Sequence, residues 1–260
     1  MIKTCVILAG GIGSRISEET SDKPKPMVKI GNLPIIHHIM NHYSNYGINH
    51  FIICAGYKSE IIKRYFSDLF YLSDHFEINF LNDQIVRKHS SNKEFHKWKI
   101  QIIETGDKSN TGWRIKKVEK LIEGENFFLT YGDGLSNVNL KKLVSRHFID
   151  TRNLVTITAV KKNNRFGNIV IDEQNYISKF IEKNKKNEEL INGGFHVVNK
   201  KALNLIKFSS CSWESDILEI LSKRKQLMCY QHTGFWQCMD SLREKQLLEE
   251  LWYSKKAPWL

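Results

Sequence analysis

The chain has 260 residues, of which 41% are hydrophobic, and its formal net charge is +11. This length and composition suit a domain with a buried core, and no apolar stretch approaches the ~20 residues of a membrane-spanning helix. The positive charge invites a nucleic-acid interpretation, but the lysines are spread along the chain and accompany no nucleic-acid-binding motif. We therefore expect one soluble, unprocessed, cytoplasmic α/β domain over residues 1–260, with a solvated lysine-rich surface and no nucleic-acid or membrane partner.

The five cysteines are odd in number, scattered and without any Cys-x-x-Cys spacing. Their positions are Cys5, Cys54, Cys211, Cys229 and Cys238. This usage suits a reducing cytosol and indicates neither a disulfide framework nor a zinc site.

The first predicted strand is an apolar run that ends in the glycine-rich turn at residues 9–13. The small residues of this turn let a backbone approach a phosphate closely. Arg15 and Lys25 follow, and two cations beside exposed backbone N–H groups are what a triphosphate requires. We predict that the turn is a nucleotide-phosphate loop.

Two better-known loops and a plain turn are the alternatives. A dinucleotide-binding fingerprint would need a third glycine where Ile16 stands, and Pro24 and Pro26 interrupt the helix expected after it. The Gly-Lys-Ser/Thr of a P-loop is missing. A plain turn has no need of the arginine and the Pro-Lys-Pro segment that follow.

The next segments alternate between helix and strand. Pro34 is placed to open a helix that Gly47 closes, a strand follows at 50–55, and Ser59 is an N-cap for a helix through residue 66. This order predicts right-handed crossovers and a parallel sheet. Residues 73–97 are polar and poorly periodic, so we predict a loop or hairpin excursion, with a lid, an assembly element and disorder as alternatives.

Regular patterns resume after this excursion. We predict a strand at 98–104, a turn at 105–112, a helix at 115–121 and a strand at 127–131. Asp133 follows the last strand between two glycines, where open α/β sheets place their ligands. It is therefore a metal-ligand candidate, and the alternative is a turn aspartate bonded to its own backbone.

The remaining predicted elements are a strand at 154–160, a hairpin of 167–172 and 176–182, a strand from residue 192, a helix from its cap Ser212 to 223, a strand at 227–231 and a helix at 241–254.

Two carboxylates and two cations could together bind a nucleoside triphosphate. Asp133 and Asp240 each follow an apolar segment and precede a helix, so both could converge on one rim of the sheet. They would hold Mg²⁺ against an α-phosphate oxygen, while Arg15 and Lys25 bind the phosphates.

Other charged residues have a simpler alternative explanation. Arg165 and Lys183 are candidates for binding a second anionic substrate, with solvated surface charge as the alternative. His38 and His42 share a helix face at a spacing that metals can use, but no third ligand is evident, so a metal role is disfavoured.

Residues 8–15 together with 23–27 resemble the signature of the sugar-1-phosphate nucleotidyltransferase family. Within this family the chain is similar to the cytidylyltransferase branch over nearly its whole length. The other segments that carry the resemblance are residues 16–20, 38–40, 46–49, 56–58, 105–107, 130–134, 165–167, 191–195, 234–237 and 256–259.

The resemblance implies a Rossmann-like, glycosyltransferase-A-like fold. Its mixed, mostly parallel sheet would be flanked by helices and carry a small β-rich appendage. The implied reaction is the Mg²⁺-dependent transfer of a cytidylyl group from CTP to α-D-glucose 1-phosphate, which gives CDP-glucose and pyrophosphate. A homo-oligomer is also implied.

The resemblance also implies roles for individual residues. The catalytic residues would be Arg15, Lys25 and Asp133, and the metal ligands Asp133 and Asp240. The sugar phosphate would contact Glu182, Lys183, Asn192 and Gly193. The nucleotide would contact Leu8, Ala9, Gly10, Gly11, Ile12, Gly13, Ser14, Arg15, Lys25, Tyr131, Gly132, Thr111 and Arg114, with a neighbouring subunit as one alternative source of the last two.

Three positions depart from the family pattern. Trp113 stands where a second glycine is usual, and Asn184 and Cys238 stand where proline is usual. None of them removes a catalytic group, but they leave open a changed sugar or an altered assembly. The alternatives are the same chemistry with another nucleoside triphosphate or sugar 1-phosphate, and a catalytically silent regulatory homologue that binds a sugar nucleotide.

Overall fold

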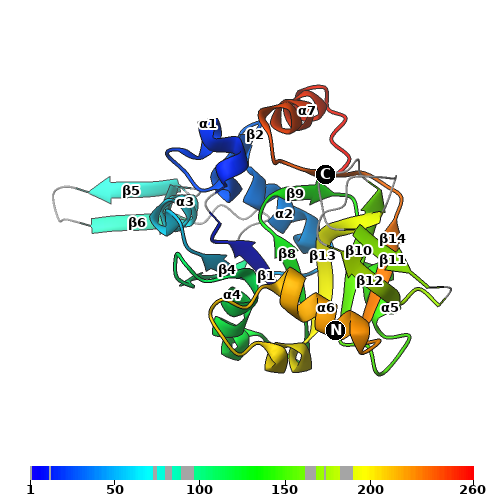
Figure 1. Cartoon of the computed structure of the whole chain (residues 1–260). Helices are drawn as coiled ribbons and strands as arrows, with labels where there is room; N and C mark the ends of the chain where they lie inside the picture. Colours follow the sequence, from blue (N-terminus) through cyan, green and yellow to red (C-terminus); the bar gives the residue numbers. More distant parts are fainter. Residues whose placement is uncertain are drawn as a thin grey trace.

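The computed structural model describes residues 2–11, 13–72, 75–79, 84–88, 97–161, 168–172, 174–181 and 190–260. Within these residues, a nine-stranded sheet forms the centre of the molecule, and helices cover both of its faces (Figure 1). The strand order is β12-β11-β13-β8-β1-β4-β7, and β10 and β14 continue the sheet from β13.

The strands of this sheet are β1 (Thr4–Ala9), β4 (His50–Ala55), β7 (Lys99–Glu104), β8 (Asn126–Tyr131), β10 (Val155–Lys161), β11 (Asn168–Ile171), β12 (Ile177–Ile181), β13 (Leu190–Asn199) and β14 (Leu227–His232). β1, β4, β7 and β8 run parallel, whereas β13 is antiparallel to β8. The predicted parallel arrangement and the predicted hairpin of β11 and β12 are therefore confirmed within the described residues.

The two faces of the sheet carry separate cores because successive strand residues point to opposite sides. In β1, Cys5 and Ile7 belong to one buried cluster, and Val6 and Leu8 to the other. A strand that is buried on both faces needs an unbroken apolar sequence, which explains the run seen in β1.

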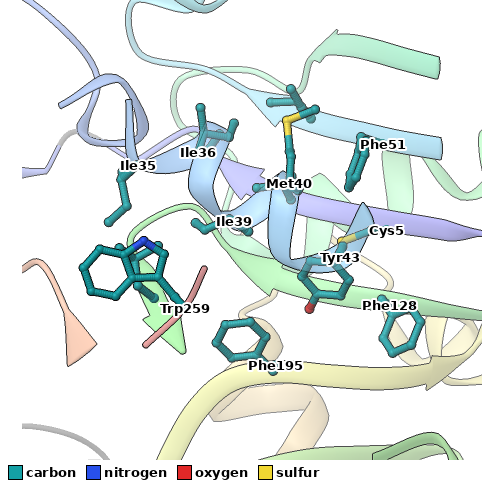
Figure 2. Packing of buried hydrophobic residues seen from close by; sticks show 14 of the residues in the cluster. Cys5, Ile35, Ile36, Ile39, Met40, Tyr43, Phe51, Phe128, Phe195 and Trp259 are labelled. Carbon is teal, nitrogen blue, oxygen red and sulfur yellow. The ribbon is translucent and has the colours of Figure 1, made fainter. Parts of the chain in front are cut away.

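The first core lies under α2 (Ile35–Ser44), α3 (Ser59–Leu72), α5 (Leu140–His147) and α7 (Leu242–Tyr253). Figure 2 shows the side chains of α2 packed toward the strands. The Tyr43 ring lies 5.4 Å from that of Phe128 and 6.0 Å from that of Phe195, between ring centroids. The second core lies under α4 (Thr111–Lys117), the π-helix η6 (Trp213–Leu218) and α6 (Glu219–Lys223).

Several short elements complete the chain. They are η1 (Ser14–Ile16), α1 (Ser17–Thr20), η2 (Lys25–Met27), β2 (Lys29–Ile30), β3 (Leu33–Pro34), η4 (Glu119–Leu121), β9 (Gly134–Ser136), η5 (Lys200–Leu205) and β15 (Trp236–Cys238). The described part of the predicted excursion forms the antiparallel hairpin β5 (His75–Asn79) and β6 (Gln84–Lys88), which extends away from the main sheet (Figure 1).

Two helices, α4 and α3, have boundaries that differ from the prediction. The helix predicted at 115–121 begins at Thr111, inside the predicted turn, because the Asn110 side chain caps it by accepting the Thr111 amide at 2.9 Å. After Lys117 the segment continues only as the 3₁₀ turn η4. α3 extends six residues beyond its predicted end at 66, and Leu69 of this extension packs against the first core.

The sequence predicts neither a disulfide framework nor a membrane-spanning helix. The structure describes all five cysteines, and none of them forms a disulfide. Over the described ranges, no helix is both long and apolar enough to pass through a membrane.

Candidate active site

The glycine-rich turn leaves the carboxyl end of β1 as predicted. Gly13 has φ of 70°, a left-handed conformation that glycine adopts without strain. The Thr20 hydroxyl donates to the Gly13 carbonyl oxygen at 3.1 Å and ties α1 back to the turn. The backbone N–H and C=O groups of the turn therefore lie at the edge of the sheet where the parallel strands end.

Asp133 and Asp240 lie in two loops that a small two-stranded sheet holds together. Strands β9 and β15 pair antiparallel, which sets Gly134 opposite Cys238. The Met239 amide then donates to the Asp133 carbonyl oxygen at 2.9 Å. The expected convergence of the two carboxylates is observed, and its cause is this strand pairing.

Lys25 lies between the two carboxylates. Its Nζ is 2.7 Å from Asp133 Oδ2 and also hydrogen-bonds Asp240 Oδ1. Arg15 Nη1 is 2.8 Å from Asp240 Oδ2 on the other side. The Lys25 side chain is only 10% exposed, whereas that of Arg15 is 64% exposed and open to a ligand.

The charges in this cluster stabilise one another. Burial alone would lower the pKa of Lys25, but Asp133 and Asp240 outweigh it and raise that pKa above its ordinary value. Burial would likewise raise the pKa of Asp240, but Lys25 and Arg15 hold it below its usual range. Lys25 is therefore protonated and Asp240 ionised at neutral pH.

The carboxylate pair fits a hard divalent cation. Asp133 and Asp240 already share one ammonium, so their oxygens face a common point. No group of three or more His, Cys, Asp or Glu side chains that could hold a metal occurs in the part of the chain that the structure describes. Two carboxylates with substrate phosphates and water are a usual ligand set for Mg²⁺.

Arg114 lies beneath the glycine-rich turn. Its Nη1 donates to Thr105 Oγ1 at 2.8 Å, and a Cβ added at Gly10 would lie 2.1 Å from the same nitrogen. Burial lowers the pKa of this guanidinium. A side chain at position 10 would therefore displace the arginine that α4 places under the turn.

Thr111 and Tyr131 are both held by Glu214. The Thr111 hydroxyl donates to Glu214 Oε2 at 2.6 Å and accepts the Trp213 amide at 2.9 Å. The Tyr131 hydroxyl donates to Glu214 Oε1. Both hydroxyls are therefore engaged within the protein.

These groups surround a cleft of about 500 Å³ at the carboxyl ends of β1 and β8. The cleft is lined by Leu8, Ala9, Gly10, Gly11, Gly13, Arg15, Lys25, Pro26, Asp107, Ser109, Asn110, Thr111, Arg114, Tyr131, Gly132, Asp133 and Asp240. A concave site with backbone amides and a cluster of paired charges suits a polyanionic ligand.

Comparison with known families decides the class of this site. The family model described as "Nucleotidyl transferase" matches residues 4–239. The chain belongs to the nucleotidyl transferase family. The charge cluster and the cleft both lie within the matched region, apart from Asp240, which follows it by one residue.

Curated relatives of this nucleotidyltransferase cover nearly the whole chain. It is 42% identical to the glucose-1-phosphate cytidylyltransferase of Salmonella typhi, across 98% of this chain and 97% of the relative. It is 35% identical to the probable glucose-1-phosphate cytidylyltransferase of Bacillus subtilis, across 98% of both. The D-glycero-alpha-D-manno-heptose 1-phosphate guanylyltransferase of Aneurinibacillus thermoaerophilus is 30% identical, across 82% of this chain and 83% of the relative.

Solved structures support the same fold at lower identity. HddC from Yersinia pseudotuberculosis gives a TM-score of 0.75 at 23% identity, across 97% of this chain and 100% of that one. UDP-glucose pyrophosphorylase complexed with UDP-glucose gives 0.76 at 20% identity, across 98% and 100%. The nucleotidyltransferase fold that the resemblance implied is confirmed.

The structure brings most of the predicted nucleotide contacts to one cleft. Leu8, Ala9, Gly10, Gly11, Gly13, Arg15, Lys25, Thr111, Arg114, Tyr131 and Gly132 all line it from a single chain. Ile12 lies outside the described residues, and of Ser14 only the backbone is described. The Thr111 hydroxyl is already committed to Glu214 and Trp213, so a nucleotide would meet its methyl group or backbone.

The predicted sugar-phosphate residues are only partly described. Glu182, Lys183 and the second-anion candidate Arg165 lie outside the described residues. Asn192 Oδ1 accepts the Gly194 amide at 2.9 Å and contacts His196 Nε2 at 2.8 Å. Among described contacts, Asn192 therefore shapes the backbone at Gly194.

His38 and His42 are both buried and pack against aromatic side chains. His38 Nε2 lies 2.9 Å from the Ile30 carbonyl oxygen, and its ring packs edge-on against Trp252. The His42 ring packs against Phe195, and burial lowers its pKa to about 4.

Two of the three departures from the family pattern are described. Trp113 packs against the second core, so it does not enter the cleft. The Cys238 thiol lies 3.9 Å from Asp240 Oδ2 and adds a weak contact beside the charge cluster. Asn184 lies outside the described residues.

Sequence reasoning missed Glu214. It occupies the first turn of the predicted helix after Ser212, a place where acidic residues are common for helix stability alone. Only the folded chain sets it against Thr111 and Tyr131.

Proposed function

We propose that this nucleotidyltransferase transfers the cytidylyl group of CTP to α-D-glucose 1-phosphate, with CDP-glucose and pyrophosphate as products. The observation that carries this proposal is the 42% identity over 98% of the chain to the Salmonella typhi glucose-1-phosphate cytidylyltransferase. The cluster of Arg15, Lys25, Asp133 and Asp240 supports it, because nucleotidyl transfer depends on charge neutralisation and in-line positioning.

The chain's own groups account for binding and charge stabilisation. The triphosphate would lie along the glycine-rich turn, where backbone amides can donate to phosphate oxygens. An oxygen of the sugar phosphate forms a bond to the α-phosphorus while the bond from that phosphorus to the bridging oxygen breaks and pyrophosphate leaves. Arg15, which is exposed, and Lys25, which stays protonated, would stabilise the charge that develops on the leaving group.

Asp133 and Asp240 would hold Mg²⁺. When bound, the ion neutralises phosphate oxygens at the reacting centre. Hydrogen bonds from Lys25 and Arg15 orient Asp240 for this role, and the pairing of β9 and β15 fixes both carboxylates relative to the turn.

A substrate panel tests the proposal. Purified protein with Mg²⁺ is given each nucleoside triphosphate with each of several sugar 1-phosphates, and the sugar nucleotide is identified by mass spectrometry. We expect the highest kcat/KM for CTP with glucose 1-phosphate. Turnover with another pair alone would reject the cytidylyl or glucose assignment, and no turnover with any pair would reject catalysis.

A second candidate keeps the chemistry and changes the substrates. The 30% identity to a heptose 1-phosphate guanylyltransferase favours including GTP and heptose 1-phosphates in the panel. A silent regulatory homologue is less well supported, because all four residues of the charge cluster are present and in contact.

We also propose that the chain is a homo-oligomer. The hairpin of β5 and β6 extends away from the main sheet and pairs with no other strand of the described chain (Figure 1). Gel filtration with light scattering should give a mass that is a multiple of 30.5 kDa. A monomer at micromolar concentration would reject this proposal.

A further inference from the structure

Glu214 lies behind the cleft and does not line it. Three hydroxyl groups donate to its carboxylate: that of Thr111 at 2.6 Å, that of Ser212 at 3.0 Å and that of Tyr131. The two carboxylate oxygens can accept all three hydroxyls, whereas an amide at this position would offer one oxygen and turn a donor group toward them.

On one side, Glu214 fixes the helix that carries Arg114. Thr111 is the first residue of α4, and its oxygen accepts the Trp213 amide, so its proton is directed to Glu214. Arg114 follows one turn later and lies under Gly10 of the glycine-rich turn. The position of Glu214 therefore sets the position of the helix beneath the nucleotide side of the cleft.

On the other side, Glu214 fixes the strand end that carries Asp133. Tyr131 is the last residue of β8 and is separated from Asp133 by Gly132 alone. Its ring packs so closely on Gly194 that an added Cβ there would lie 2.5 Å from the ring. The ring is thus held by Gly194 at Cδ2 and by Glu214 at its hydroxyl.

We propose that Glu214 is a positioning residue that sets the spacing between the α4 wall and the Asp133 strand end. It acts through Thr111 and Tyr131 and touches no reacting atom. This inference deepens the proposed function and takes its kinetic readout from it.

The first test is Glu214→Gln, with Glu219→Gln as the matched control. Glu219 lies on the following helix, and among the contacts of the described residues its carboxylate pairs with Lys223 at 3.7 Å. Loss of a hydrogen-bond acceptor that carries charge is expected to lower kcat/KM by about tenfold to a hundredfold, with a raised KM for the nucleotide and a lowered kcat. The control is expected to stay within about twofold of the wild type. Wild-type constants in Glu214→Gln would overturn the proposal.

A double-mutant cycle with Tyr131→Phe separates positioning from a general loss of stability. Because both changes break the same hydrogen bond, the double variant should lose at least about threefold less kcat/KM than the product of the two single losses. Losses that multiply would overturn the proposal, since they would mean that Glu214 does not act through Tyr131.

Nucleotide binding without turnover distinguishes failure of this inference from failure of the proposed function. Calorimetry with CTP, and with each other nucleoside triphosphate, should give weaker binding to Glu214→Gln than to the wild type. If the wild type binds a nucleotide but turns over no substrate pair, the proposed reaction is wrong, and weaker binding by the variant still supports positioning. Equal binding by both proteins, or no binding by the wild type, would overturn it.

Discussion

In the described structure, a hollow lies at each end of the parallel strands β1 and β8. The cleft at their carboxyl ends measures about 500 Å³, and the groove at their amino ends about 610 Å³. The cleft is lined by three carboxylates, three cations and glycine backbone, the charged residues being Asp107, Asp133, Asp240, Arg15, Lys25 and Arg114. The groove is mainly apolar, and its lining includes Ile2, Tyr46, Ile48, Phe128, Leu140, Val144 and Phe148.

The difference between the two hollows teaches that charge placement, and not volume, identifies the site. Buried charges are costly unless they are paired. Lys25 and Asp240 can be buried at the carboxyl ends of the strands because each stabilises the charge of the other. Parallel strands also direct their following loops to that same end, where ligands of open α/β sheets bind. The predictions below set the charged cleft against the apolar groove.

The largest expected effect comes from removing a carboxylate charge in the cleft. Asp133→Asn and Asp240→Asn should each lower kcat by more than about 10³-fold, because Mg²⁺ and the cations lose their partner. Pyrophosphate release measures this effect. The control is Asp150→Asn, whose carboxylate pairs only with the neighbouring Arg152 in the described contacts, and it should stay within about twofold. A rate near that of the wild type in either cleft variant would remove that residue from the site.

Lys25→Met should have the next largest effect, a fall in kcat of about 10²–10³-fold. It removes the ammonium that lies between Asp133 and Asp240 while keeping a side chain of similar length. Lys63→Met serves as the control, since Lys63 pairs with Glu104 at the surface. If Lys25→Met kept its kcat and changed only KM, Lys25 would bind the ground state and not stabilise the transition state.

A smaller effect concerns acid stability. The pKa of Asp240 is lowered in the folded state, so its contribution to stability is present above the ordinary aspartate range near pH 4 and is lost as pH falls through the folded pKa. Asp240→Asn should therefore be less stable than the wild type at pH 7, and this difference should shrink below about pH 4. Urea unfolding at several pH values measures it, and a pH-independent difference would contradict the assignment.

The smallest effect is expected in the groove. Phe148 is 57% exposed there, and Phe148→Ser should change neither kcat/KM beyond about twofold nor the free energy of unfolding beyond about 0.5 kcal/mol. A marked loss of turnover would mean that the amino ends of the strands take part in the reaction. The contrast between a functional charged cleft and a non-functional apolar groove would then be wrong.

Local patterns in the sequence predicted the elements that depend on local chemistry. The apolar run of β1 and the glycine-rich turn after it carry their own signals, and so does the Ser241 cap of α7, which accepts the Glu244 amide. The start of α4 was missed because Gly112 disfavours a helix, whereas the Asn110 cap and packing outweigh that preference.

Contacts between distant segments could not be predicted in this way. Asp133 and Asp240 were recognised as candidates, but the β9 and β15 pairing that joins them depends on strands of three residues each. Glu214 resembles an ordinary helix-start carboxylate until the fold sets Thr111 and Tyr131 against it.

The most direct test of the central proposal is a time course with CTP, glucose 1-phosphate and Mg²⁺, in which pyrophosphate and CDP-glucose are both quantified. We predict equal amounts of the two products, with neither formed when the sugar phosphate is omitted or the metal is chelated. Consumption of CTP without CDP-glucose, or at the same rate without glucose 1-phosphate, would contradict the proposed cytidylyl transfer.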